Sequence, residues 1–467
     1  MFNKFFTETA IFAILPQLPK ILNLFILPFL MDHLDTKDFG IYGLVLAYMG
    51  ATAFFKDLGL YNSFFTSFYN YKYRYKIVWS KIFGILTIWS LPYTVIVGFI
   101  LFFFLSSMEI ESMSLLLFVL LFPLLVFENT ILIGNVKYRL DFKITQIAII
   151  TSISSVVSVG LSYVLIVEYG LGYLGWFYSM FVSSAINFIC FSYVVFVKEK
   201  IFPIFKIKIR TLKAFLKISL PFIPHNYSSY LVTTSDRLVL NFYKVDINEI
   251  GLYNFSYQFP HYFSVIDHAI GMVAFPYYME NYSKKNHTNN KILFVILSKL
   301  LLVGTFTICL WFKEIILIFT NEAQYETAYI FSIIILMSFN YRPFYMASTW
   351  HLFQEENSKM LLKISFFAGI INVSLNLIFI PFFGIKAAAI ITFISYIYLG
   401  FSGFLIKGNV LPIKYDFKRY FLIIISSTLF VYLIRDISVN YKLTLTLILI
   451  FYLYLTIKNF IKKNNDK

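Results

Sequence analysis

Long apolar runs separated by short polar connections are the feature that most constrains how this sequence can fold. A membrane-spanning helix needs about 20 mostly apolar residues, and no connection between the runs exceeds about twenty residues, which leaves no room for a separate soluble domain. Only 13% of the residues are charged, against roughly 25% in soluble domains. We therefore predict an all-α integral membrane protein with about fourteen transmembrane helices, near residues 9–31, 39–63, 82–106, 114–135, 144–167, 172–197, 219–242, 251–276, 292–312, 327–352, 361–381, 385–406, 420–434 and 443–457.

Lysine and arginine crowd into alternate connections, which is the pattern that the positive-inside rule predicts. The connection over 198–218 is strongly basic, whereas the connections assigned to the opposite side hold only Lys37, Lys244, Lys313, Lys386, Arg435 and Lys442. We therefore expect both termini on the cytoplasmic side. Membrane orientation also explains the net charge of +15 without nucleic acid as a partner.

Motifs for metals, disulfides and nucleotides are missing from the sequence. Cys190 and Cys309 lie in apolar runs without ligand spacing, so we infer neither a disulfide nor a metal site. No GxxxxGK[ST] phosphate loop is present, which argues against direct coupling to ATP. We therefore predict no cofactor other than H⁺ or Na⁺ as a coupling ion.

An internal repeat links the two halves of the chain. The stretch LDTKDFGIYGL (34–44) resembles VDINEIGLYNF (245–255) at an offset of 211 residues, and the same offset places Lys56 over Asp267 and Asp57 over His268. A generic turn could also explain the loop match, with glycine giving backbone freedom and tyrosine an interfacial anchor. Because six predicted helices separate equivalent points, the repeat predicts two like-oriented bundles, as in some transporters. The predicted divisions are a first lobe (1–197), a basic linker (198–218), a second lobe (219–406), and two further helices with a basic tail (407–467).

Several charged side chains fall inside the predicted spans. A lone charge at the centre of a bilayer costs at least about 2.5 to 3.5 kcal/mol, so such residues generally face the bundle interior or a wet cavity. Lys299 begins only about two turns into its helix and can reach the surface. The cations that we assign to a substrate cavity are Lys20, Lys56, Arg237 and Arg342, and the candidates for ion coupling are Asp57, Glu128, Asp236, Asp267 and His268.

The seventh predicted span is unusually polar. Consecutive residues on a helix point about 100° apart, so we expect Asp236 and Arg237 each to need a partner on another helix or on a ligand, and Arg237 to meet an anionic head group. Snorkelling to the membrane surface or a structural ion pair are the alternatives for Arg237, which lies roughly six residues from the outer end of this span. Asn226 and Tyr227 are further cavity candidates that could hydrogen-bond a sugar, or instead neighbouring helices.

Two stretches carry a family resemblance. Residues 215–259, which include SDRLVLNFYKVDINEIGLYNF, and residues 27–49, LPFLMDHLDTKDFGIYGLVLAYM, resemble the O-antigen-type polysaccharide flippases of the multidrug/oligosaccharidyl-lipid/polysaccharide exporter superfamily. The resemblance implies two six-helix lobes in a V shape with two trailing helices in the bacterial plasma (inner) membrane. It implies translocation of an undecaprenyl-diphosphate-linked oligosaccharide, an O-antigen or other surface polysaccharide unit, to the outer leaflet.

The resemblance also bears on the cavity and on partners. Family members have a cationic lumen, whereas this chain keeps several acids there. Membrane lipid is an expected partner, and a polysaccharide polymerase and chain-length proteins are the protein partners that the resemblance suggests.

Three other classes of protein compete with this interpretation. A drug or cation antiporter of the same superfamily would share the architecture, but several cations within the spans argue against a cationic drug. A membrane-embedded polysaccharide polymerase or glycosyltransferase would be expected to carry a long external loop or domain. A purely structural scaffold would not need so many charges within its spans.

Overall fold

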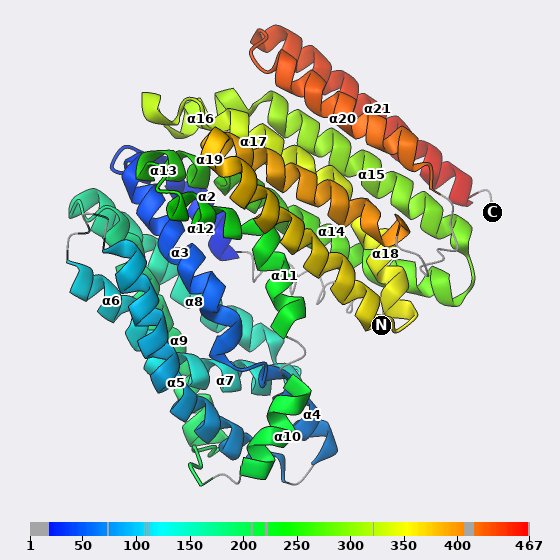
Figure 1. Cartoon of the computed structure of the whole chain (residues 1–467). Helices are drawn as coiled ribbons and strands as arrows, with labels where there is room; N and C mark the ends of the chain where they lie inside the picture. Colours follow the sequence, from blue (N-terminus) through cyan, green and yellow to red (C-terminus); the bar gives the residue numbers. More distant parts are fainter. Residues whose placement is uncertain are drawn as a thin grey trace. The chain divides into compact units, whose positions relative to one another are not determined.

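A computed structural model describes residues 18–465 apart from 72–73, 107, 109, 111, 207–208, 220–222, 321 and 406–414. Every regular element within these residues is helical (Figure 1), which confirms the predicted all-α class. The chain divides into two compact units, unit 1 over Met1–Tyr230 and unit 2 over Leu231–Lys467, and each is described by itself.

Unit 1 contains broken as well as continuous helices. α2 packs on α8, α8 packs on α9, and α3 packs on both α5 and α9. The helix that follows α6 passes through a π-helical segment, η2, that begins at Pro123, a residue without a backbone N–H to donate. The elements are α2 (Leu18–Met31), α3 (Thr36–Lys56), α4 (Tyr61–Asn70), α5 (Tyr75–Leu105), α6 (Met113–Phe122), η2 (Pro123–Phe127), α7 (Glu128–Leu140), α8 (Ile144–Tyr163), η3 (Val164–Glu168), α9 (Tyr173–Ser192), η4 (Tyr193–Lys198), α10 (Ile209–Ser219) and most of α11 (Ile223–Thr233).

Unit 2 is built around α15, which packs against α14, α17, α20 and α21. α19 is two helices joined at Gly384, whose φ of 54° and ψ of −135° are not helical, so the predicted division near residue 383 is confirmed. The elements are α12 (Ser235–Phe242), α13 (Ile247–Ser256), α14 (Gln258–Ser283), α15 (His287–Leu310), α16 (Phe312–Phe319), η6 (Ala323–Tyr325), α17 (Ala328–Met337), η7 (Ser338–Tyr341), α18 (Arg342–Gln354), α19 (Ser358–Leu405), α20 (Phe417–Ile434) and α21 (Val439–Asn465).

Ten helices in the described residues are long and apolar enough to cross a membrane. They include the joined helices over Lys359–Leu405, and a shorter apolar helix covers Ile21–Met31. The chain is therefore a multi-pass membrane protein, while the total of fourteen spans stays a prediction. Short helices such as α12 and α13 are separated by breaks, which is why a criterion of length does not count them.

The two units share the way in which their second helix begins. Asp35 caps the N-terminus of α3 by accepting from the Asp38 N–H, and Asp246 caps α13 by accepting from the Asn248 N–H. In unit 1, Asp38 also accepts from the Tyr173 N–H at 2.8 Å, just after Gly172 with its φ of 50°. These caps occupy corresponding positions of the two sequence stretches that define the repeat.

The contact between Asp38 and the turn at Gly172 has a counterpart in unit 2. Glu249 lies 211 residues after Asp38, and its carboxylate lies beside Gly384, which again has a positive φ, of 54°. An acid in the first turn of the second helix thus meets a left-handed glycine in both units, where other residues would be strained. The likeness of the two sequences is therefore more than a generic turn.

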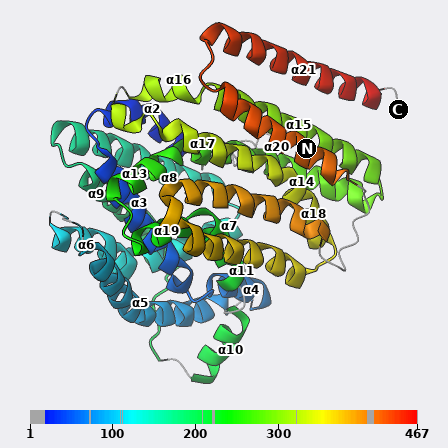
Figure 2. The same cartoon turned by 45° about the horizontal axis from the view of Figure 1, so that its top comes forward.

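The basic linker is held against the rest of unit 1. α10 packs on α4 (Figures 1 and 2). Lys76 forms an ion pair with Glu199 at 3.1 Å, and the Ile204 N–H donates to the Ser80 carbonyl at 2.9 Å. Gly84 on α5 lies directly beneath the backbone of Ile204. The start of the linker is thus a fixed strap across α5.

Replacing Gly84 with alanine is expected to displace this strap. The added methyl group would overlap the backbone carbonyl of Ile204, and a backbone atom cannot move aside as a flexible side chain can. We expect faster proteolysis after Lys206 in membrane vesicles. The control is Gly160→Ala, because nothing in the structure lies within 4 Å of a methyl group there. Equal proteolysis of the two variants would contradict the strap.

The helices α20 and α21 form a hairpin (Figure 2). They pack on α15, and polar contacts also hold the hairpin to the rest of unit 2. Lys442, with a side chain only 1% exposed, pairs with both carboxylate oxygens of Glu314, at 2.6 and 2.9 Å. Near the turn of the hairpin, Asp436 accepts hydrogen bonds from Lys313 and Tyr329. Burial opposes the shift, but these hydrogen bonds outweigh it and lower the pKa of Asp436 below its usual value.

Candidate functional site

In unit 1, a lysine at the end of one helix pairs with an acid at the start of another. Lys56 is the last residue of α3, and its Nζ donates to Glu128 Oε2 at 2.8 Å. Glu128 is the first residue of α7, directly after the π-helical segment. Both side chains are about one-third exposed, at 32% and 30%. A single contact therefore joins two charges that remain open to their surroundings.

In unit 2, an arginine pairs with a buried aspartate. Arg342 begins α18 after the 3₁₀ segment η7, and its Nε donates to Asp267 Oδ2 at 2.9 Å. The Asp267 side chain is 3% exposed and that of Arg342 is 22% exposed. Among the described residues, neither terminal amino group of Arg342 donates a hydrogen bond and Asp267 Oδ1 accepts none. The pair thus uses one of the five N–H donors of the guanidinium.

The two pairs occupy equivalent places in the repeat with opposite polarity. Lys56 and Asp267 lie 211 residues apart on the second helix of each half, while Glu128 and Arg342 each begin the helix after a break in the fourth. The second helix therefore supplies the cation in unit 1 and the acid in unit 2. Both units therefore have an ion pair between these two helices, although the helix that carries the cation differs between them.

The neighbouring residues Asp236 and Arg237 pair with each other, so the expectation that they could not do so is wrong. The helix breaks at Thr234 and restarts at Ser235. In this first turn, Asp236 Oδ1 accepts from the Arg237 backbone N–H at 2.8 Å and from Arg237 Nη1 at 3.0 Å. The break leaves the backbone N–H groups of the first turn without partners within the helix, and an acid is favoured at a helix N-terminus.

Both residues also have the partners on another helix that were predicted. Tyr253 on α13 donates to Asp236 Oδ2 at 2.5 Å, and Asn254 accepts from Arg237 Nε at 3.0 Å. The ring of Tyr257 lies 4.3 Å from the guanidinium carbon. With side chains 0% and 7% exposed, Asp236 and Arg237 form a buried ion pair. The predicted contact of Arg237 with an anionic head group stays a prediction.

The remaining candidate residues are dispersed. Tyr227 stacks on Tyr230 with ring centroids 5.4 Å apart. Asp57 accepts from the Gly59 N–H at 3.0 Å and so shapes the turn after α3, while His268 is exposed on α14 next to Asp267. The side chains of Lys20 and Asn226 lie outside the described part of the structure. No group of three His, Cys, Asp or Glu side chains that could hold a metal is found among the described residues.

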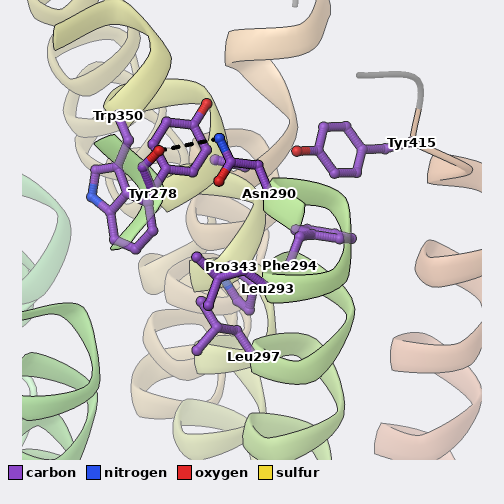
Figure 3. Close-up of a pocket in the computed structure, with 9 residues that line it drawn as sticks. Tyr278, Asn290, Leu293, Phe294, Leu297, Pro343, Trp350 and Tyr415 are labelled. Carbon is purple, nitrogen blue, oxygen red and sulfur yellow. Dashed lines mark hydrogen bonds between the residues drawn. The ribbon is translucent and has the colours of Figure 1, made fainter. Parts of the chain in front are cut away.

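A small aromatic pocket lies in unit 2, where α14, α15 and α18 meet the segment before α20 (Figure 3). Asn290 donates to the Tyr278 carbonyl at 3.2 Å, while its own Oδ1 is buried without a partner among the described residues. The walls are mainly aromatic and aliphatic, and none of the charged pairs lines the pocket. It has about 210 Å³ of empty space, and we assign it no role.

Residues that the sequence reasoning missed are the aromatic and amide partners of the charges. Tyr253 and Asn254 lie in the repeat stretch 245–255, but the sequence analysis gives neither of them, nor Tyr257, a role beside the charges. Tyr345, whose ring lies 5.6 Å from the guanidinium carbon of Arg342, was missed as well. The available signal was spacing, because Tyr253 and Tyr257 are one helical turn apart.

Solved structures place this fold in one class of membrane transporter. The chain matches the lipid II flippase MurJ in its inward closed conformation with a TM-score of 0.73 and 17% identity, over 98% of this chain and 100% of that one. An inward-facing multidrug resistance MATE family transporter of the MOP superfamily matches with a TM-score of 0.62 and 17% identity, over 89% and 98%. A Pyrococcus furiosus MOP superfamily transporter, described as having a binding pocket of reverse polarity, matches with a TM-score of 0.51 and 17% identity, over 89% and 94%. The chain therefore shares its fold with these three membrane proteins.

The family follows from the sequence itself. Residues 7–282 match the model of a family described as polysaccharide biosynthesis protein, and this is more than half of the chain. The chain belongs to that family, and the predicted resemblance is confirmed. No curated protein matches it. The solved proteins that share this fold are described as a flippase and as transporters, not as enzymes.

Proposed function

We propose that the protein is a flippase that carries an undecaprenyl-diphosphate-linked oligosaccharide from the cytoplasmic to the outer leaflet of the bacterial plasma membrane by alternating access. The glycan would be an O-antigen or other surface polysaccharide unit. Membership in a polysaccharide biosynthesis family and the fold shared with a lipid II flippase support this proposal. A polysaccharide polymerase and chain-length proteins remain proposed partners.

The observation that carries the proposal is the openness of Arg342. A diphosphate cannot enter hydrocarbon bare, and a guanidinium binds phosphate oxygens through two parallel N–H···O bonds. Arg342 has both terminal amino groups available within the described structure. Lys56 offers a second, weaker point of contact in unit 1, because only one of its three donors makes a hydrogen bond to the described residues.

The membrane potential can supply the driving force. With the inside negative, each negative charge that moves outward gains about 2.3 kcal/mol per 100 mV. Two phosphate charges would therefore gain roughly 4 to 5 kcal/mol at that potential. Coupling to H⁺ or Na⁺ remains a prediction, with Asp57, Glu128, Asp236, Asp267 and His268 as its candidates.

The way in which the charged side chains are paired supports a drug or cation antiporter less well than a flippase with an anionic substrate. A cationic drug would need an acid that is free to face it, but Glu128 and Asp267 each already face a fixed cation. Asp236 is buried in its own pair. The cations, by contrast, retain unused donors, which favours an anionic substrate.

A deletion strain tests the proposal. We expect lipid-linked glycan to accumulate on the inner face of the membrane and surface glycan to disappear, both restored by the wild-type gene. Single repeat units that are still exported would instead indicate a polymerase. Normal surface glycan together with new drug sensitivity would overturn the flippase in favour of the antiporter.

A further inference from the structure

The pairs Lys56–Glu128 and Arg342–Asp267, whose cations are partly exposed, have fewer contacts than two more deeply buried pairs of the chain. Lys442 contacts both carboxylate oxygens of Glu314, and Arg237 is bonded through its Nε, its Nη1 and its backbone N–H. Lys56 and Arg342 each make a single contact with their acid. The pairs with several contacts suit a permanent structural role, whereas the single-contact pairs are easier to separate.

In the Arg342–Asp267 pair, both side chains have polar atoms that make no hydrogen bond to the described residues. Asp267 Oδ1 is buried without a partner in the described structure, which is costly for a carboxylate oxygen. The terminal amino groups of Arg342 belong to a side chain that is 22% exposed. The acid is therefore incompletely bonded, and the cation has its free donors where another anion can reach them.

Resting on the proposed function, we propose that Glu128 and Asp267 are stand-in counterions. Each carboxylate neutralises its cation while the transporter is empty, and a phosphate group of the lipid-linked substrate takes the cation over when it binds. When the substrate leaves, the carboxylate returns to the cation. The two acids are thus positioning residues that act on substrate through Lys56 and Arg342.

Elementary electrostatics explains why such an exchange is useful. A bare cation within a membrane protein is expensive, so an empty site without an acid would be strained or would fill with another anion. A tightly bonded acid would resist displacement by the substrate. An acid that makes a single charge-assisted hydrogen bond lies between these two cases. It neutralises the cation, but a phosphate can displace it because the phosphate can offer two oxygens to a guanidinium where Asp267 offers one.

The reversed polarity of the two units supports a role for the pair as a whole. If one helix had to carry the cation for reasons of packing, both units would be expected to place it there. Instead the cation lies on the second helix in unit 1, as Lys56, and after the break of the fourth helix in unit 2, as Arg342. In both places it lies at a helix end, and its acid lies on the facing helix.

A binding measurement on the purified full-length protein tests the stand-in role. The probe is undecaprenyl diphosphate in detergent, with undecaprenol as its uncharged control. We expect Glu128→Gln and Asp267→Asn each to bind the diphosphate lipid about tenfold more tightly than wild type, a change of about 1.4 kcal/mol. Export per molecule should fall, because substrate leaves the unopposed cation more slowly. Glu314→Gln, in the buried pair with Lys442, should leave the affinity unchanged.

The outcomes separate this proposal from the function on which it rests. Unchanged or weaker diphosphate binding by both acid variants would show that the acids only hold the cations in place, and would overturn the stand-in role. Wild-type binding of undecaprenyl diphosphate no tighter than that of undecaprenol would instead count against phosphate recognition as a whole. Melting temperatures of the variants identify any loss of affinity that comes from unfolding.

A charge exchange gives a second, independent test. Lys56→Glu alone would place two carboxylates together and should abolish most export. Adding Glu128→Lys recreates in unit 1 the polarity that unit 2 already has, and should restore at least about half of the export. Failure of the double variant to export, at a normal protein level, would refute the equivalence of the two pairs.

Discussion

Replacing Arg342 with alanine is expected to reduce export of lipid-linked glycan at least about tenfold. The change removes the only described guanidinium in the chain that combines partial exposure with two unused terminal amino groups inside the apolar helices. Each hydrogen bond to a charged group contributes about 1.5 to 3 kcal/mol, and tenfold in binding corresponds to about 1.4 kcal/mol. Surface glycan, measured per molecule of transporter in the membrane, gives the readout.

A double variant separates loss of binding from loss of folding. Alanine at position 342 alone would leave the buried Asp267 carboxylate without its cation, which is destabilising. Arg342→Ala with Asp267→Asn removes both charges, so we expect a wild-type protein level and still no export. Lys299→Ala is the matched control, because Lys299 contacts only the edge of the bundle at Thr456 and Tyr452 and should export normally. Wild-type export by the double variant would defeat the assignment.

Apolar length and the positions of charges were sufficient to predict the all-α class and a multi-pass membrane protein, but not the breaks within the helices. The repeat was also visible in sequence, because both copies carry an aspartate followed by glycine and tyrosine at the same offset. These features depend on residues close together in the chain. Local patterns of this kind survive in a single sequence, and the structure adds that Asp35 and Asp246 each cap a helix.

The pairing of the charges could not be predicted in the same way. Glu128 and Lys56 are 72 residues apart, and which helix faces which depends on packing. The offset of 211 places Asp267 over Lys56, but it places Phe339 over Glu128, since Arg342 lies 214 residues after Glu128. The two breaks differ in length, as a π-helical segment in unit 1 and a 3₁₀ segment in unit 2. A comparison at a constant offset therefore misses the second ion pair.

The pair Asp236–Arg237 shows a different limit. A continuous helix was assumed through residues 219–242, and on such a helix the two side chains diverge. The break at Thr234 makes Asp236 a first-turn residue with free N–H groups beside it. Breaks that follow from tertiary packing rather than from proline are not evident in sequence, so the pairing of Asp236 with Arg237 was not predicted.

Replacing Arg237 with alanine is therefore expected to damage folding rather than recognition. The variant leaves Asp236 as a fully buried carboxylate whose cation is gone, and breaking a buried pair in this way costs about 3 to 5 kcal/mol. Tyr253 still donates to Asp236, which offsets only part of that loss. We expect a sharply reduced protein level in the membrane and a lower melting temperature in detergent, with export falling in proportion to the protein.

The companion variant Asp236→Asn with Arg237→Met tests whether the charges themselves matter. It removes both charges while keeping side chains of similar volume, and replacing a buried ion pair by uncharged groups is often neutral for stability. We expect protein level and export per molecule to recover together, because neither charge meets the substrate. If instead the double variant is stable but does not export, or if Arg237→Ala is stable and inactive, then Arg237 belongs to the substrate path. The contrast between its buried guanidinium, which makes several hydrogen bonds, and the partly exposed one of Arg342 would then be wrong.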